Sequence, residues 1–107
     1  MIEFTASGPA IVISRAIEEY ARAQGHVNAL VVPWESDAVH LRMAVTSVKS
    51  DGWAIEHINL GTIVLTASDD ETTRVAVEPP ASPQEPTLAA AFDRFARQLQ
   101  TKFAVAS

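Results

Sequence analysis

The sequence predicts an α+β fold: a four- to five-stranded, mostly antiparallel sheet, with a long C-terminal helix packed across one face and a shorter N-terminal helix. In the last quarter of the chain apolar residues recur at spacings of four, three, four and four, one stripe at helical period: Leu88, Phe92, Phe95, Leu99 and Phe103. From about Val39 onward, short segments of alternating polarity are separated by turn residues. Because neither element buries its apolar side alone, the helix is expected to lie on the sheet.

The chain begins with a predicted edge strand over residues 2–6, where apolar and polar residues alternate. Pro9 ends it, because Pro is favoured at the first position of a helix. Apolar residues at helical spacing then predict a helix that Gly25 terminates. The alternative interpretation makes Ala10–Ile13 a strand. The longer helix is preferred, since Pro9 explains its start without a further turn.

Residues 26–37 carry weaker signals. Ala29–Val32 fit a short strand that Pro33 halts, and a loop containing Trp34 follows. Two interpretations of this tryptophan stay open. It plugs the open end of the core, which is preferred, or it anchors a ligand or partner, as exposed tryptophans do at interfaces.

The middle of the chain predicts a meander of four antiparallel strands, at residues 39–46, 53–58, 62–67 and 73–77. The turns between them are expected at Ser50-Asp51-Gly52, Asn59-Leu60-Gly61 and Asp69-Asp70-Glu71. Alternation places one set of side chains toward the core: Val39, Leu41, Met43, Val45, Trp53, Ile55 and His57. A capping box, Ser82-Pro83-Gln84-Glu85, permits the last helix to start near 83, with 87 as the conservative start and an end near Phe103.

Composition indicates one domain spanning residues 1–107, because the length is near the commonest domain size and the apolar share is 48%. The net charge is −5, so nucleic acid is not expected as a partner. Basic residues gather only on the last helix, at Arg94, Arg97 and Lys102, opposite the apolar stripe. They are interpreted as a solvated face, with Asp93 and Arg97 as a helical ion pair.

The absence of cysteine excludes disulfides, thiolate metal sites and a cysteine nucleophile. No run of 18 apolar residues predicts a membrane span. The first residues lack the basic and apolar regions of a signal peptide. A cytoplasmic protein without a membrane partner is therefore expected.

Candidate chemistry is sparse. His57 is predicted beside apolar residues, and two interpretations of it stay open. It acts as a general acid or base in a pocket, or it is a core or rim residue whose ring nitrogens are hydrogen-bonded within the fold. The second interpretation is preferred. Asp37 and His40, with Glu35 nearby, would need a third ligand to hold a metal. The serines at 14, 36 and 47 have no base placed beside them. We expect no catalytic residue, no metal and no cofactor.

Three segments, residues 3–17, 61–77 and 88–103, carry a resemblance to a known family. They hold an opening strand that turns at Ser7-Gly8-Pro9 into a helix, a late hairpin and a closing helix. This order resembles the helix-grip arrangement of the START and Bet v 1-like superfamily, which includes polyketide cyclase-like proteins. The resemblance implies a ligand pocket between the last helix and the sheet. Members are usually longer, with more strands around a larger cavity, and share no single motif, so no catalytic residue carries over.

Two classes of function follow. The preferred one is a small-molecule binding domain that holds an apolar ligand between the last helix and the sheet. Its expected lining is Leu41, Met43, Trp53, Ile55, His57, Leu65, Phe92, Phe95 and Leu99. The alternative is a protein-interaction or homodimerisation module without a ligand. The outer sheet face offers one surface for a homodimer, at His40, Arg42, Thr46, Glu56, Thr62, Val64, Thr66 and Arg74.

Overall fold

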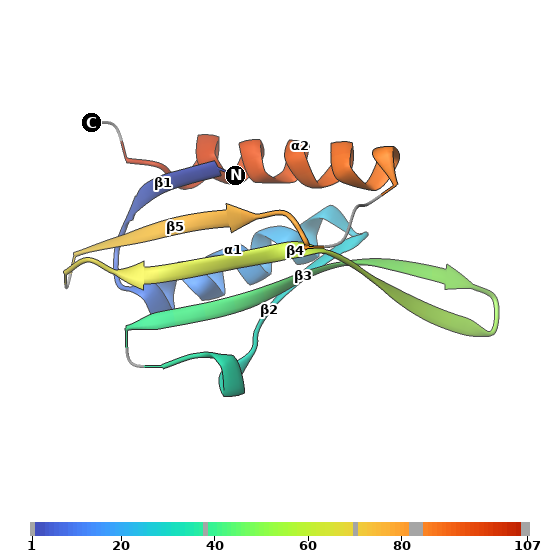
Figure 1. The fold of residues 1–107 in the computed structure, drawn as a ribbon, viewed down its shortest axis with the longest axis horizontal. Coiled ribbons are helices and arrows are strands. Elements are labelled where there is room, and N and C mark those ends of the chain that lie inside the picture. Colours follow the sequence, from blue (N-terminus) through green and yellow to red (C-terminus); the bar gives the residue numbers. More distant parts are fainter. Residues whose placement is uncertain (1, 38, 70, 82–84, 106–107) are drawn as a thin grey trace.

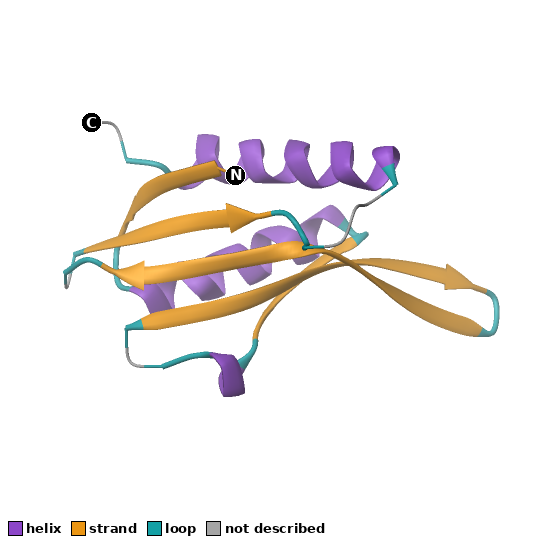
Figure 2. Cartoon of the chain, in the orientation of Figure 1, coloured by secondary structure: helices purple, strands orange, loops and turns teal. Residues whose placement is uncertain are grey.

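The computed structural model describes residues 2–37, 39–69, 71–81 and 85–105. In chain order its elements are β1 (Ile2–Ser7), α1 (Ala10–Gln24), β2 (Val27–Val31), the short 3₁₀ helix η1 (Pro33–Glu35), β3 (His40–Asp51), β4 (Ala54–Ala67), β5 (Thr72–Glu78) and α2 (Pro86–Phe103). The predicted α+β class is confirmed, with five antiparallel strands and two helices (Figures 1 and 2). None of these helices is long and apolar enough to cross a membrane.

The sheet has the strand order β1-β5-β4-β3-β2, and every neighbouring pair is antiparallel. The two edge strands therefore run in the same direction, and α1 crosses the sheet to connect them (Figure 1). The edge of β1 is partly covered, because the N–H of Val105 donates to the carbonyl oxygen of Thr5 at 2.8 Å. Sheet edges with unpaired backbone groups favour unwanted pairing with other chains, and this segment shields one of them.

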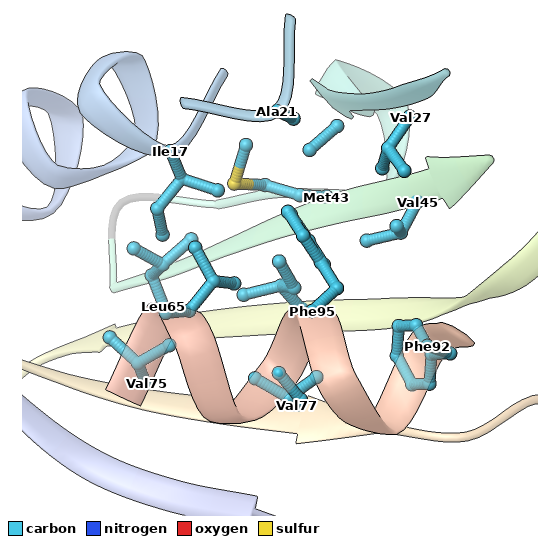
Figure 3. Packing of buried hydrophobic residues seen from close by; sticks show 14 of the residues in the cluster. Ile17, Ala21, Val27, Met43, Val45, Leu65, Val75, Val77, Phe92 and Phe95 are labelled. Atoms are coloured by element: carbon cyan, nitrogen blue, oxygen red, sulfur yellow. The ribbon is translucent and has the colours of Figure 1, made fainter. Parts of the chain in front are cut away.

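Both helices cover the same face of the sheet. Figure 3 shows Phe95 of α2 beside Met43 of β3 and Leu65 of β4, with Ile17 of α1 on the other side of the same cluster. The Tyr20 ring of α1 stacks on Phe95, with ring centroids 6.2 Å apart. The predicted stripe on α2 faces this core: Phe92, Phe95 and Leu99 are buried, and Leu88 and Phe103 are half-buried.

The N-terminal helix forms as the Pro9 and Gly25 signals predict. It spans Ala10–Gln24, and Gly25 ends it with φ of +85° and an N–H bonded to the carbonyl oxygen of Arg22. The alternative strand at Ala10–Ile13 is therefore wrong. For α2, the first three residues of the predicted capping box lie outside the described residues, and the helix starts at Pro86.

The expected turn at Asn59-Leu60-Gly61 is wrong, because β4 runs without interruption from Ala54 to Ala67. The segment forms a β-bulge instead: Val45 pairs with Gly61 and Thr46 pairs with Asn59, which leaves Leu60 as the extra residue. The Asn59 side-chain oxygen accepts a hydrogen bond from the Gly61 N–H at 3.1 Å. Residues predicted as two strands are thus one long strand.

The bulge also reverses the faces of the residues before it. An extra residue in a strand moves every preceding side chain to the opposite face. Leu60 is buried with the core, whereas Ile55 and His57 are exposed. The predicted core orientation of Trp53, Ile55 and His57 is therefore wrong.

Two further expectations about burial are wrong. Val39 lies in the loop before β3 and is 49% exposed, since its N–H is held by the Asp37 carboxylate instead of by a strand. Trp34 is 84% exposed on η1 and does not plug the core.

Candidate functional site

The nine residues predicted to line a ligand site divide into two groups. Six belong to the body of the protein, where Met43, Leu65 and Leu99 are 0% exposed, Phe92 and Phe95 are buried, and Leu41 is half-buried. The other three, Trp53, Ile55 and His57, lie on the projecting end of the β3–β4 hairpin and are exposed. The structure does not bring the two groups together.

The spaces beside α2 are small, whereas Leu41 lines a separate cavity of about 430 Å³ at the start of α1, on the far side of the core from His57. Two cavities adjoin the sheet-facing side of α2, with volumes of about 180 Å³ and about 200 Å³. Ligand sites usually occupy roughly 300 Å³ or more. Neither cavity is lined by His57. Phe92 and Phe95 each line one of them, but Met43, Leu65 and Leu99 line neither and act as core packing.

The most prominent surface feature is the hairpin end, which we call the arm and define as residues 48–57. Its four residue pairs run from Val48↔His57 to Asp51↔Ala54. The pairing of β2 with β3 ends at Ser47, and that of β5 with β4 ends at Thr62. The arm is therefore a two-stranded ribbon with no third strand alongside in the described part of the chain (Figure 1).

The tip of the arm is apolar and uncovered. Gly52 and Trp53 form its two-residue loop, and Gly52 has φ of +65°, the sign that the first central position of a type II′ hairpin turn requires. Trp53 is 103% exposed, so its whole side chain faces solvent, and Ile55 is 68% exposed. Pairing places Val48, Ile55 and His57 on one face of the ribbon. The arm thus presents an apolar surface that nothing in its own chain covers among the described residues.

The cavity of about 180 Å³, which we call the recess, lies at the base of the arm, between the first half of α2 and the end of α1. Its apolar lining is Val27, Leu60, Leu88, Ala91 and Phe95, and its polar lining is Gln24, His26, Ser47, Arg94 and Gln98. Ser47 directly precedes the arm, and Leu60 is the bulged residue of β4. The recess therefore combines apolar walls with amide, imidazole and guanidinium groups in a space for one side chain.

A second, shallower groove runs between the two helices and is lined by Tyr20, Arg94, Arg97, Gln98, Thr101 and Lys102. The Lys102 ammonium lies over the Tyr20 ring, 5.4 Å from its centroid. Arg97 bonds to Asp93 at 2.8 Å, as the sequence predicts. These cations are exposed, so water screens them, and the groove agrees with the predicted solvated helix face.

The Asp37–His40 pair orders a loop. The N–H groups of His40 and Val39 each donate to Asp37 Oδ1 at 2.8 Å, and these bonds hold the pKa of the carboxyl below its usual value. The His40 imidazole lies 3.5 Å from the same oxygen. No group of three metal-ligating side chains occurs in the described ranges. The pair therefore acts as a turn-stabilising contact.

Two of the three candidate serines, Ser14 and Ser36, are engaged with the backbone. Ser14 Oγ donates to the carbonyl oxygen of Ile11 at 2.8 Å. Ser36 Oγ donates to Val32 at 2.8 Å and accepts from the Arg42 N–H at 3.0 Å. Such bonds stabilise turns and helices, and they do not activate a hydroxyl as a nucleophile.

Sequence reasoning missed both the arm and the recess. A signal for the arm was available in the sequence. The turn residues Asp51 and Gly52 are followed directly by Trp53, and β4 begins at the next residue. The recess had no local signal, because its walls come from α1, α2 and three strands. No protein-family model, curated protein or solved structure matches the chain.

Proposed function

We propose that the protein is a self-associating interaction domain, in which the arm of one copy packs against the arm of a second copy. The observation that carries this proposal is the complete exposure of Trp53 at the tip of a two-stranded ribbon. An isolated two-stranded hairpin is marginally stable in water. A buried tryptophan typically removes roughly 150–250 Å² of surface from water, so a covered tip stabilises both the arm and the complex.

A second copy is the occupant that fits the arm best. The Val48 N–H still bonds to the carbonyl oxygen of His26 at 3.0 Å, but along residues 49–51 and 54–57 the ribbon has outer edges that no other described strand pairs. Identical edges related by a two-fold axis run antiparallel and satisfy each other's backbone groups. Ile55 and Val48 lie on one face of the ribbon, so the contact also buries apolar side chains.

The outer face of the sheet, the surface that the sequence suggested for a homodimer, is a weaker candidate. It carries Arg42, Arg74 and several threonines, and Arg74 forms an ion pair with Glu3 at 2.9 Å on this face. Burying such charges without new partners is unfavourable. The arm also carries charged residues, at Lys49, Asp51 and Glu56, but its tip exposes Trp53 and Ile55 to a much greater extent than the outer face exposes apolar groups.

Binding of a small apolar ligand between α2 and the sheet, the function that the helix-grip resemblance implies, is less well supported. The spaces there measure about 180 Å³ and about 200 Å³. Three of the nine expected lining residues lie on the arm, away from α2. We therefore prefer the interaction module.

Replacing Trp53 and Ile55 together with serine is expected to abolish self-association. In a two-fold contact each substituted residue is present once from each copy, so each substitution removes two contacts. A central aromatic contact such as that of Trp53 contributes about 2 kcal/mol or more to the binding free energy, which is roughly 30-fold in affinity. Light scattering at micromolar concentration should give about twice the 11.5 kDa of one chain for the natural protein and a single chain for the variant.

The matched control is Trp34→Ser. Trp34 is 84% exposed, but it lies on η1 before β3, at the opposite end of that strand from the arm. This variant should remain dimeric. A natural protein that is monomeric throughout the micromolar range, or a Trp53→Ser/Ile55→Ser variant that still dimerises, would exclude the proposed contact.

A further inference from the structure

We infer that Trp53 of each copy inserts into the recess of the other copy, so that each binding site is completed by a residue of its partner. This inference rests on the proposed self-association and adds its specific contact. The position, the size and the chemistry of the recess all support it.

The recess lies where a partner's tip would arrive. Two arms that run antiparallel around a two-fold axis place the turn of one beside the base of the other. From Ser47 to Gly52 the ribbon extends roughly 17 Å, at about 3.3 Å per residue. The recess sits at that base, because Ser47 and Leu60 both line it. The same extension keeps a chain's own Trp53 away from its own recess.

The recess has room for one aromatic side chain. A cavity of about 150 Å³ holds a benzene ring. The recess measures about 180 Å³, which falls short of the roughly 300 Å³ at which sites for small-molecule ligands begin. Its size therefore suits a single inserted ring and does not suit a drug-sized molecule.

The lining of the recess matches an indole group. Val27, Leu60 and Phe95 provide apolar contact for the ring. The carboxamide oxygens of Gln24 and Gln98 accept hydrogen bonds, and a buried indole N–H needs such an acceptor. The Arg94 guanidinium is placed among the lining groups, and a cation over an indole face is a favourable contact.

Complementary variants test the insertion. Trp53→Ala removes the inserted ring and leaves the recess open, whereas Ala91→Phe fills the recess and leaves Trp53 intact. Each variant alone should be monomeric at concentrations where the natural protein dimerises. Their equimolar mixture should form a heterodimer with one intact contact. We expect its affinity to exceed that of either homodimer by roughly tenfold or more, as hot-spot contacts do. Native mass spectrometry distinguishes the three species.

Two further variants keep the test decisive. Gln98→Phe covers the recess from an exposed position on α2, so it repeats the Ala91→Phe experiment without a change in the packed interior. Gln100→Phe adds the same side chain to an exposed position on α2 outside the recess lining, and it should remain dimeric. If the natural protein dimerises but neither recess variant weakens the dimer, the insertion is wrong and the proposed self-association stands. If the natural protein is monomeric, both are wrong.

Discussion

Replacing Phe95 with alanine is expected to lower the free energy of unfolding by roughly 3–5 kcal/mol, the usual range for removing a buried phenylalanine. Phe95 is 3% exposed and stacks on Tyr20, so its loss leaves a cavity between both helices and the sheet. Chemical denaturation monitored by far-ultraviolet circular dichroism measures this change. Gln100→Ala, at an exposed position of the same helix, is the control and should change the free energy by less than about 0.5 kcal/mol.

A loss below about 1 kcal/mol for Phe95→Ala would contradict the packing of α2 on the sheet, because substitutions on a solvent-facing side of a helix have effects of that size. The comparison with Gln100→Ala separates the effect of burial from any change in helix propensity. Alanine is the better helix former in both cases, so propensity alone would stabilise each variant slightly.

Gly61→Ala is expected to destabilise the protein by roughly 2–5 kcal/mol, through backbone strain together with overpacking. Gly61 has φ of +154°, a conformation that residues with side chains rarely adopt. A Cβ atom there would lie 2.5 Å from the carbonyl oxygen of Glu78 and 2.5 Å from a ring atom of Phe92. The residue must therefore be glycine for β4 to pass close to β5 and α2 at the bulge.

Gly25→Ala is the matched control. Gly25 also has a positive φ, +85°, but an added Cβ would meet no atom within 4 Å. Only the left-handed backbone penalty applies, roughly 1–2 kcal/mol. Thermal or chemical denaturation of both variants measures the difference. Equal losses at the two positions would mean that β4 does not approach Phe92 as closely as the structure places it.

The elements with strong local signals were predictable from the sequence. The α2 stripe repeats at helical period over four turns, and Pro9 and Gly25 mark the ends of α1 through their own backbone preferences. These signals depend only on neighbouring residues. The strand over residues 73–77 was likewise found within β5 because its alternation continues without an irregularity.

The bulge was not predictable in the same way. Asn59-Leu60-Gly61 has the composition of a turn, and the sequence alone does not show that Val45 and Thr46 pair on either side of Leu60. The choice between turn and bulge depends on a strand that lies more than ten residues away. One misassigned residue then reversed the expected faces of Ile55 and His57.

Three of the nine residues of the predicted site were misplaced for a related reason. Whether Trp53 is buried depends on where the neighbouring strands end, and β2 and β5 stop before they reach the arm. The six body residues of the predicted site did join one apolar cluster, because they follow alternation and helical period. The recess escaped prediction, since its walls meet only in the folded chain.

Amide hydrogen exchange at two protein concentrations shows whether a second copy covers the arm. If a second copy covers the arm, the amides of residues 48–57 should become more protected as the concentration rises from the monomeric to the dimeric range. The amides of Glu35 and Ser36, which bond to the carbonyl oxygens of Val32 and Pro33 at the opposite end of β3 from the arm, exchange through local opening and should not change. Exchange in the arm that is fast and independent of concentration would mean that no second copy covers it.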